Sequence, residues 1–231
     1  MAIGLGRLFG IRLPANFNSP YNSLNIIEFW RRWHMTLSRF LRDYIYISLG
    51  GNRKGKSRRY INLLLTMLIG GIWHGAGWTF VLWGTYHGIL LALNHALTGY
   101  DILKNKVTVP LSKTITFLLV VFGWVLFRAA DLDSASKMLS AMVGFGFPAT
   151  NATTLVKPEK WAIVGGLLFF VWVFPNTQQL FKNYRLILND DYEKNSINWT
   201  PKMRWVLITS LLLVTGVLSL SNVSEFLYYQ F

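Results

Sequence analysis

Forty consecutive residues, from Ile61 to Tyr100, contain no Asp, Glu, Lys or Arg, and this run most narrows what the chain can fold into. One helix of that length would rise about 60 Å, against roughly 30 Å for the hydrocarbon core of a bilayer. Glycines gather near the middle of the run, at Gly70, Gly71, Gly75 and Gly77. The run therefore predicts a broken or re-entrant helix pair over 61–100.

The break carries a histidine, in the order Trp73-His74-Gly75-Ala76-Gly77-Trp78. Non-helical backbone at membrane depth is tolerated only where it is buried in protein or lines a cavity. An ionisable side chain at that depth is costly, and it marks a functional site by default. The sequence therefore predicts that His74 lies beside a cavity and has a chemical role.

The composition favours an integral membrane protein. Only 14% of the 231 residues are charged, against about 25% in a soluble domain, and 52% are apolar. Trp161 to Phe181 is uncharged over 21 residues and Trp205 to Ser224 over 20, each long enough to cross a bilayer. Val107 to Phe127 is a further expected span, and a short helix is expected from Asp133 to Val143. The predicted fold is an all-α, multi-pass membrane protein.

Positive charge is concentrated at the start of the chain. Residues 1–60 hold 11 Lys and Arg against two acidic residues, which places +9 of the net +13 there. Five of these cations form a glycine-punctuated basic loop, namely Arg53, Lys54, Lys56, Arg58 and Arg59. Beside membrane spans, such a loop indicates the cytoplasmic face and contact with anionic lipid headgroups rather than with nucleic acid. It could equally attract an anionic substrate.

Residues 23–48 read as an amphipathic helix in the plane of the membrane interface. An apolar stripe at helical spacing consists of Trp30, His34, Leu37, Leu41 and Tyr44. Charged residues occupy the other face, at Glu28, Arg32, Arg39, Arg42 and Asp43. A basic, aromatic-rich helix of this kind lies on a membrane rather than across it. His34 is notable because it falls on the apolar stripe.

The four histidines differ in the chemistry that they indicate. A neutral imidazole can take the proton of a hydroxyl as that hydroxyl attacks an acyl group. This role suits His74, and for His34 it stands beside a purely structural one. His87 and His95 lie near Asn94 on the expected helix from Trp78 to Leu97, where hydrogen bonding between helices is the better interpretation. The spacing of the histidines predicts no metal site, and there is no cysteine to ligate a metal or act as a nucleophile.

Several motifs resemble those of the membrane-bound O-acyltransferase family, in particular its alginate O-acetyltransferase branch. The first is Phe29 to Gly55, which opens Phe-Trp-Arg-Arg-Trp-His and closes Gly-Gly-Asn-Arg-Lys-Gly. The second is the Trp73–Trp78 stretch with His74. Three shorter stretches also fit, Gly10–Phe17, Leu126–Asp131 and Phe226–Phe231. The resemblance covers essentially all of residues 1–231 and corresponds to the C-terminal half of family members.

This resemblance implies a multi-pass enzyme of the bacterial inner membrane with two active-site histidines. It assigns the catalytic base to His74 and a second active-site role to His34. Trp30, Trp33, Trp73 and Trp78 are expected to shape the substrate tunnel. Acetyl-CoA or an acyl-carrier thioester is the expected donor substrate, with no bound cofactor. The expected acceptor is an exported polysaccharide such as alginate, with a periplasmic acetyltransferase as partner. Two alternatives stand for the N-terminal half of family members: a separate polypeptide supplies it, or the chain is a truncated product.

Three other functions stay open at this point. The transferred group could be D-alanine or another acyl group, since the D-alanine-exporting branch of the family shares both histidines. The chain could be a non-catalytic membrane fragment that acts as an assembly partner. A transporter or channel subunit would predict paired carboxylates in the spans, and the expected spans contain none.

Overall fold

The computed structural model describes residues 2–97, 108–145, 158–184 and 199–219, and all regular structure in these ranges is helical. The predicted all-α class is therefore confirmed for this part of the chain. The chain divides into two compact units, one of Met1–Pro14 with Pro175–Phe231 and one of Ala15–Phe174. Both predicted motif histidines lie in the second unit. The closing Phe226–Phe231 motif and the end of the Trp205–Ser224 run lie outside the described residues.

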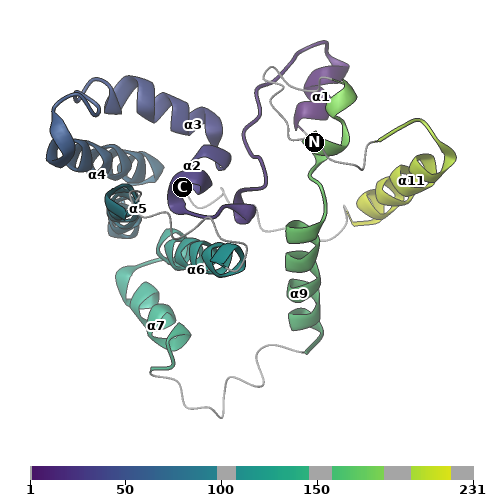
Figure 1. The fold of residues 1–231 in the computed structure, drawn as a ribbon. Coiled ribbons are helices and arrows are strands. Elements are labelled where there is room, and N and C mark those ends of the chain that lie inside the picture. Colours follow the sequence, from purple (N-terminus) through teal and green to yellow (C-terminus); the bar gives the residue numbers. More distant parts are fainter. Residues whose placement is uncertain (1, 98–107, 146–157, 185–198, 220–231) are drawn as a thin grey trace. The chain divides into compact units, whose positions relative to one another are not determined.

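The larger unit is built around three long helices (Figure 1). Its elements are η1 (Pro20–Asn22), α2 (Ile26–Arg32), α3 (Met35–Phe40), η2 (Leu41–Tyr46), α4 (Gly55–His74), α5 (Trp78–Leu97), α6 (Thr108–Arg128), α7 (Leu132–Met142) and α9 (Pro158–Val173). Helix α5 packs between α4 and α6, while α2 packs on α5 and α7 on α6. The α7 helix lies within one residue of its predicted limits at each end.

Glycines let α4 and α5 approach each other closely. A Cβ atom on Gly84 would lie 2.4 Å from the carbonyl oxygen of Met67, and one on Gly88 would lie 2.9 Å from the Cα of Leu64. Such small residues are what permit close helix contact inside membranes. The helices are joined by Gly75–Gly77, residues with low helix propensity apart from the intervening alanine. Helix α4 begins at Gly55, so the expected start at Ile61 was too late.

The single helix expected over 23–48 is wrong. The structure has two short helices, α2 and α3, followed by the π-helical turn η2. Helix α2 ends where Trp33 is extended, and His34 then takes a left-handed conformation with φ 42°. Helical periodicity is present in the sequence, but the helical backbone is interrupted at Trp33 and His34. As a consequence, His34 does not share one helical stripe with Trp30 and Leu37.

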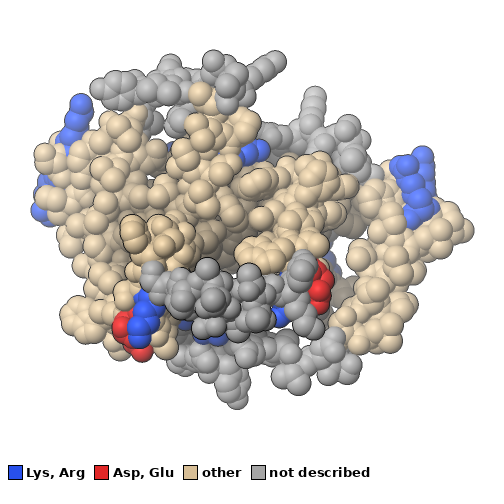
Figure 2. Space-filling view, turned by 90° about the horizontal axis from the view of Figure 1, so that it is seen from below, with Lys and Arg blue, Asp and Glu red and all other residues tan. Residues whose placement is uncertain are grey.

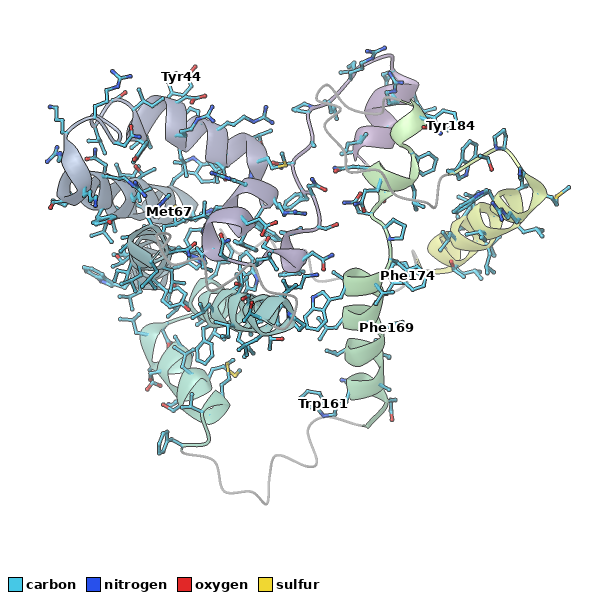
Figure 3. The ribbon with its side chains drawn as sticks, viewed as in Figure 1. Tyr44, Met67, Trp161, Phe169, Phe174 and Tyr184 are labelled. Carbon is cyan, nitrogen blue, oxygen red and sulfur yellow. The ribbon has the colours of Figure 1, made fainter. Side chains whose placement is uncertain are left out.

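Helix α9 is attached to its unit by a few contacts at its C-terminal end. The Trp172 indole Nε1 donates to the carbonyl oxygen of Tyr21 over 3.2 Å, and the Asn22 amide donates to the carbonyl oxygen of Val171 over 3.1 Å. Along the rest of the helix, large apolar side chains such as Trp161 and Phe169 are exposed (Figure 3).

The smaller unit contains α1 (Ala2–Leu8), α10 (Thr177–Leu180), η4 (Lys182–Tyr184) and α11 (Met203–Leu218). The Asn176 side chain caps α10, and Gln179 completes the capping box. The rings of Phe181 and Trp199 stack with centroids 5.4 Å apart. Every described side chain of α11 except that of Trp205 is exposed.

By length and composition, α6 is the one helix in the described ranges that could cross a membrane, and α11 is a shorter apolar helix. Helix α5 is as long as a span, but two histidines, Asn94 and two tryptophans lower its hydropathy. On the face drawn in Figure 2, uncharged residues make up most of the described surface. Large exposed apolar side chains are frequent on α9 and α11, where they include Phe169 and Leu211.

Candidate active site

His74 is the last residue of α4, and aromatic rings surround its imidazole. Its ring centroid lies 5.2 Å from that of Trp83 on α5 and 5.0 Å from that of Phe127 on α6. Phe80, which packs under Gly75, lies 6.4 Å away. The side chain is half-buried, so it can reach both the protein interior and a molecule arriving from outside. The glycine break thus presents an imidazole at the end of a helix.

His34 lies between α2 and α3, in the left-handed conformation that residues with a Cβ atom rarely adopt. Such strain clusters at functional sites and persists only where surrounding contacts impose it. The Nδ1 atom is buried and makes no hydrogen bond to another residue that the structure describes. Burial lowers the pKa of His34 below its ordinary value, which keeps the imidazole neutral and able to accept a proton near pH 7.

His34 and His74 lie at the two ends of one aromatic cluster, although 39 residues of chain lie between them. A row of aromatic rings leads from one to the other. Each neighbouring pair in this row has centroids between 4.8 and 6.1 Å apart: His34–Phe17, Phe17–Trp33, Trp33–Trp124, Trp124–Phe127 and Phe127–His74. The site is therefore two imidazoles beside an aromatic wall that α2 and α6 share.

The four tryptophans expected to shape a tunnel do not gather in this chain. Trp30 is buried against Trp83, with centroids 5.8 Å apart, and Trp33 belongs to the aromatic wall. In contrast, Trp73 is 64% exposed and touches His74 with one edge, while Trp78 is 72% exposed. Of the four, Trp73 contacts His74 and Trp30 contacts His87, with ring centroids 4.9 and 5.2 Å apart.

His87 was missed as a member of this centre. It is 1% exposed, and its ring lies 5.1 Å from Trp83 and 5.2 Å from Trp30. Its Nε2 atom lies so close to α6 that a Cβ on Gly123 would be 2.5 Å away. The sequence does contain a signal for the burial of His87. Trp83 and Leu91 each stand four residues from it, so the three side chains share one face of α5.

The expectation that His87 forms hydrogen bonds between helices is wrong for Nδ1, which has no partner among the described residues. The expected hydrogen bonding between helices is found at Asn94. Its Oδ1 accepts from the backbone N–H of Ile27 over 3.2 Å and ties α5 to α2. His95 is half-buried on the same helix. The polar link between α2 and α5 is therefore made by the amide rather than by an imidazole.

The basic loop is shorter than expected, because Lys56, Arg58 and Arg59 belong to the first turns of α4. Arg53 and Lys54 precede the helix, and all five cations except the half-exposed Arg59 are exposed. Asn62 holds the loop from inside, its amide donating to the carbonyl oxygens of Gly51 over 2.8 Å and of Leu49 over 3.2 Å. The partial positive charge of a helix N-terminus adds to that of these side chains.

The arrangement can perform proton transfer at one edge of an apolar protein. A neutral imidazole on a helix end can accept a proton from a hydroxyl. Aromatic walls exclude water, which strengthens electrostatic interactions at the reacting atoms. The fold and this site together define an all-helical membrane protein with a paired-histidine centre.

Comparison with known proteins identifies the family within this class. The family model for the membrane-bound O-acyltransferases matches residues 1–128. The chain belongs to the membrane-bound O-acyltransferase family. Residues 1–128 hold both motif histidines and the helices from α2 to α6.

Two curated relatives match along the whole chain, and a third matches about half of it. A "Probable alginate O-acetylase AlgI" of Pseudomonas putida is 43% identical over 100% of this chain and 49% of its own length. A "Peptidoglycan O-acetyltransferase" of Helicobacter pylori is 42% identical over 100% of this chain and 45% of its own length. A "Teichoic acid D-alanyltransferase" of Bacillus subtilis is 33% identical over 54% of this chain and 35% of its own length. The chain spans about half the length of these curated relatives, and it matches the C-terminal half of the first.

Proposed function

We propose that this chain carries the histidine centre of a membrane-embedded O-acyltransferase, which passes an acetyl group from a cytoplasmic thioester towards a cell-envelope polysaccharide. The observation that carries the proposal is the placement of His34 and His74 on one aromatic wall, where His34 contacts Phe17 and His74 contacts Phe127. Family membership supplies the class of reaction. The two relatives that match the whole chain are named for O-acetyl transfer, which favours acetate over D-alanine and a polysaccharide such as alginate as acceptor.

In this mechanism His74 is the general base. Its neutral imidazole takes the proton from an acceptor hydroxyl while the hydroxyl oxygen attacks the thioester carbonyl. The tetrahedral intermediate then collapses, the carbon–sulfur bond breaks, and the departing thiolate recovers the proton from the imidazolium. His34 orients the reacting hydroxyl or stabilises the charge that passes through His74. A positioned general base contributes about 10²- to 10⁴-fold to such a reaction.

The tryptophans, the basic residues and the partners also have proposed roles in this mechanism. Trp30, Trp33 and Trp73 line the path of the acyl group, and the exposed cations from Arg53 to Arg59 attract the phosphates of acetyl-CoA or of a phosphopantetheinyl carrier. The protein is multi-pass in a bacterial inner membrane, with residues 23–48 at the interface. The acceptor side includes a periplasmic acetyltransferase partner, and a further polypeptide segment completes the wall of the site.

A second candidate, D-alanyl transfer to an envelope polymer, is favoured by the Bacillus subtilis relative, whose match covers about half of the chain. Mass spectrometry of the acyl group released from donor-loaded protein distinguishes acetate from D-alanine. A third, non-catalytic assembly role predicts binding to a partner without any acyl release.

The test is acyl transfer in reconstituted vesicles, with an isotopically labelled acetyl thioester, an alginate acceptor, and the chain supplied alone or with the N-terminal half of a relative. His74→Ala should lower the rate about 10²-fold or more, and His34→Ala should also lower it. His95→Ala is the matched control, since it removes an imidazole from α5 away from the aromatic wall, and it should retain the rate. Full activity of His74→Ala would show that the base lies elsewhere.

A further inference from the structure

The left-handed backbone of His34 is held by a segment that precedes it in the chain. The backbone N–H of Asn18 donates to the carbonyl oxygen of Arg32 over 2.9 Å, just before His34. The backbone N–H of Met35, just after it, donates to the carbonyl oxygen of Asn16 over the same distance. Residues 16–18 therefore fasten the chain on both sides of the histidine.

The side chain of Asn16 adds a second fastening. Its Oδ1 accepts hydrogen bonds from the backbone N–H of Thr36 over 3.1 Å and from the hydroxyl of Thr36 over 2.9 Å. These two contacts satisfy a free N–H at the start of α3 that an N-cap side chain would otherwise bind. The residue in the N-cap position is His34 itself, and its side chain makes no such bond. Asn16 therefore caps α3, and the His34 imidazole does not make the capping hydrogen bond.

This fastening decides where the imidazole points. The sequence from 23 to 48 has the periodicity of one continuous helix, and in that helix His34 would lie on the stripe of Trp30 and Leu37. The left-handed conformation instead turns the chain between α2 and α3. Because a side chain's direction follows from the φ and ψ of its own residue, releasing the turn would turn the His34 ring away from its present place near Phe17.

We propose that Asn16, acting through Thr36, is a positioning residue that holds His34 in the left-handed conformation and so keeps its imidazole against Phe17, at one end of the aromatic wall that leads to His74. Its consequence for catalysis rests on the proposed function, whereas its consequence for the conformation of His34 does not. Asn16 touches neither histidine ring; it acts on the backbone that carries one of them.

The experiment compares the full chain with its variants in lipid nanodiscs by NMR, following the ring and Cα signals of His34, which His34→Gln identifies. Asn16→Leu removes both side-chain hydrogen bonds and Thr36→Val removes one, whereas Thr36→Ser keeps the hydroxyl. We expect the first two variants to move the His34 Cα shift out of the left-handed range and its titration towards that of an exposed imidazole. Thr36→Ser should restore both to the values of the unchanged protein. Thr85→Val, which removes a hydroxyl bonded within α5, is the matched control and should leave His34 unchanged.

Acyl transfer gives the second measurement. Misplacing a catalytic group by about 1 Å can cost on the order of 10²-fold in rate, so kcat should fall between about tenfold and 10²-fold in Asn16→Leu, at unchanged KM for the donor. A wild-type His34 signal in both Asn16→Leu and Thr36→Val would overturn the proposal, whatever the activity. If the unchanged chain transfers no acyl group, the proposed function fails while the NMR result still decides the role of Asn16. If Asn16→Leu does not fold, the pair Thr36→Val and Thr36→Ser decides it.

Discussion

Helices α5 and α9 are both apolar and lie in the same unit, yet they are held in opposite ways. Helix α5 buries Trp83, Gly84, His87, Gly88 and Leu91 against its neighbours. Helix α9 has a longer uninterrupted apolar stretch, and none of its described side chains is buried. Apolar composition therefore does not predict which helix is buried against the rest of the protein. Packing follows the residues that allow close contact, namely small residues along the seam and flat rings beside it.

The contrast also separates two environments. The buried face of α5 carries the His87 imidazole and the Trp83 indole N–H, and neither His87 Nδ1 nor Trp83 Nε1 has a hydrogen-bond partner among the described residues. Burying such polar groups costs free energy, which the close packing of α5 has to offset. The surface of α9 offers aliphatic and aromatic side chains that a lipid tail can solvate as well as another leucine can.

The largest effect is expected at the glycine seam. Gly84→Leu would push the α5 backbone away from Met67, because even a Cβ atom would lie 2.4 Å from the Met67 carbonyl oxygen. Overpacking of this kind costs about 3 kcal/mol or more when backbone must move. The matched change in α9 is Gly166→Leu, where nothing lies within 4 Å of the added atom. Unfolding by SDS titration should show a large loss in the free energy of unfolding for Gly84→Leu and little change for Gly166→Leu. Equal losses would show that α5 and α9 are packed equally closely.

A smaller effect is expected from removing one packed side chain. Leu91→Ala should lower the free energy of unfolding by about 2 kcal/mol, because Leu91 is 7% exposed and its loss leaves a cavity. Leu167→Ala on α9 starts from a side chain that is 59% exposed and should change the free energy by no more than about 0.5 kcal/mol. The same titration in one detergent checks both. A loss at Leu167 as large as that at Leu91 would mean that α9 packs on protein.

The smallest effect is expected with pH. Burial lowers the pKa of His34, so the folded protein binds this proton less tightly than the unfolded chain does. Between the lowered value and the ordinary 6.5, the unfolded chain holds more protons, and stability therefore rises with pH. Lowering the pH from about 7.5 to about 5.5 should thus reduce the unfolding temperature.

A matched variant isolates this component, because His34→Gln should flatten the part of the pH dependence that His34 contributes. From Trp161 onwards, α9 has no titratable side chain and should contribute nothing to it. An unaltered pH dependence in His34→Gln would show that His34 is as well hydrated in the folded protein as in the unfolded chain.

The sequence alone determined the helical class, the break at Gly75–Gly77 and the short helix that became α7. These follow from composition, glycine placement and local periodicity, which depend on neighbouring residues only. The motifs around His34 and His74 also pointed to the family, because both histidines stand in distinctive sequence contexts.

Tertiary structure decided the rest. The periodicity of 23–48 predicted one helix, but hydrogen bonds from Asn16, 20 residues before Thr36, impose a turn at His34 that local propensity does not favour. The burial of His87 depends on the approach of α6 through Gly123, and the exposure of Trp78 depends on the absence of any neighbour among the described helices. Periodicity describes a helix by itself, whereas the place of each imidazole and indole is set by partners distant in the chain.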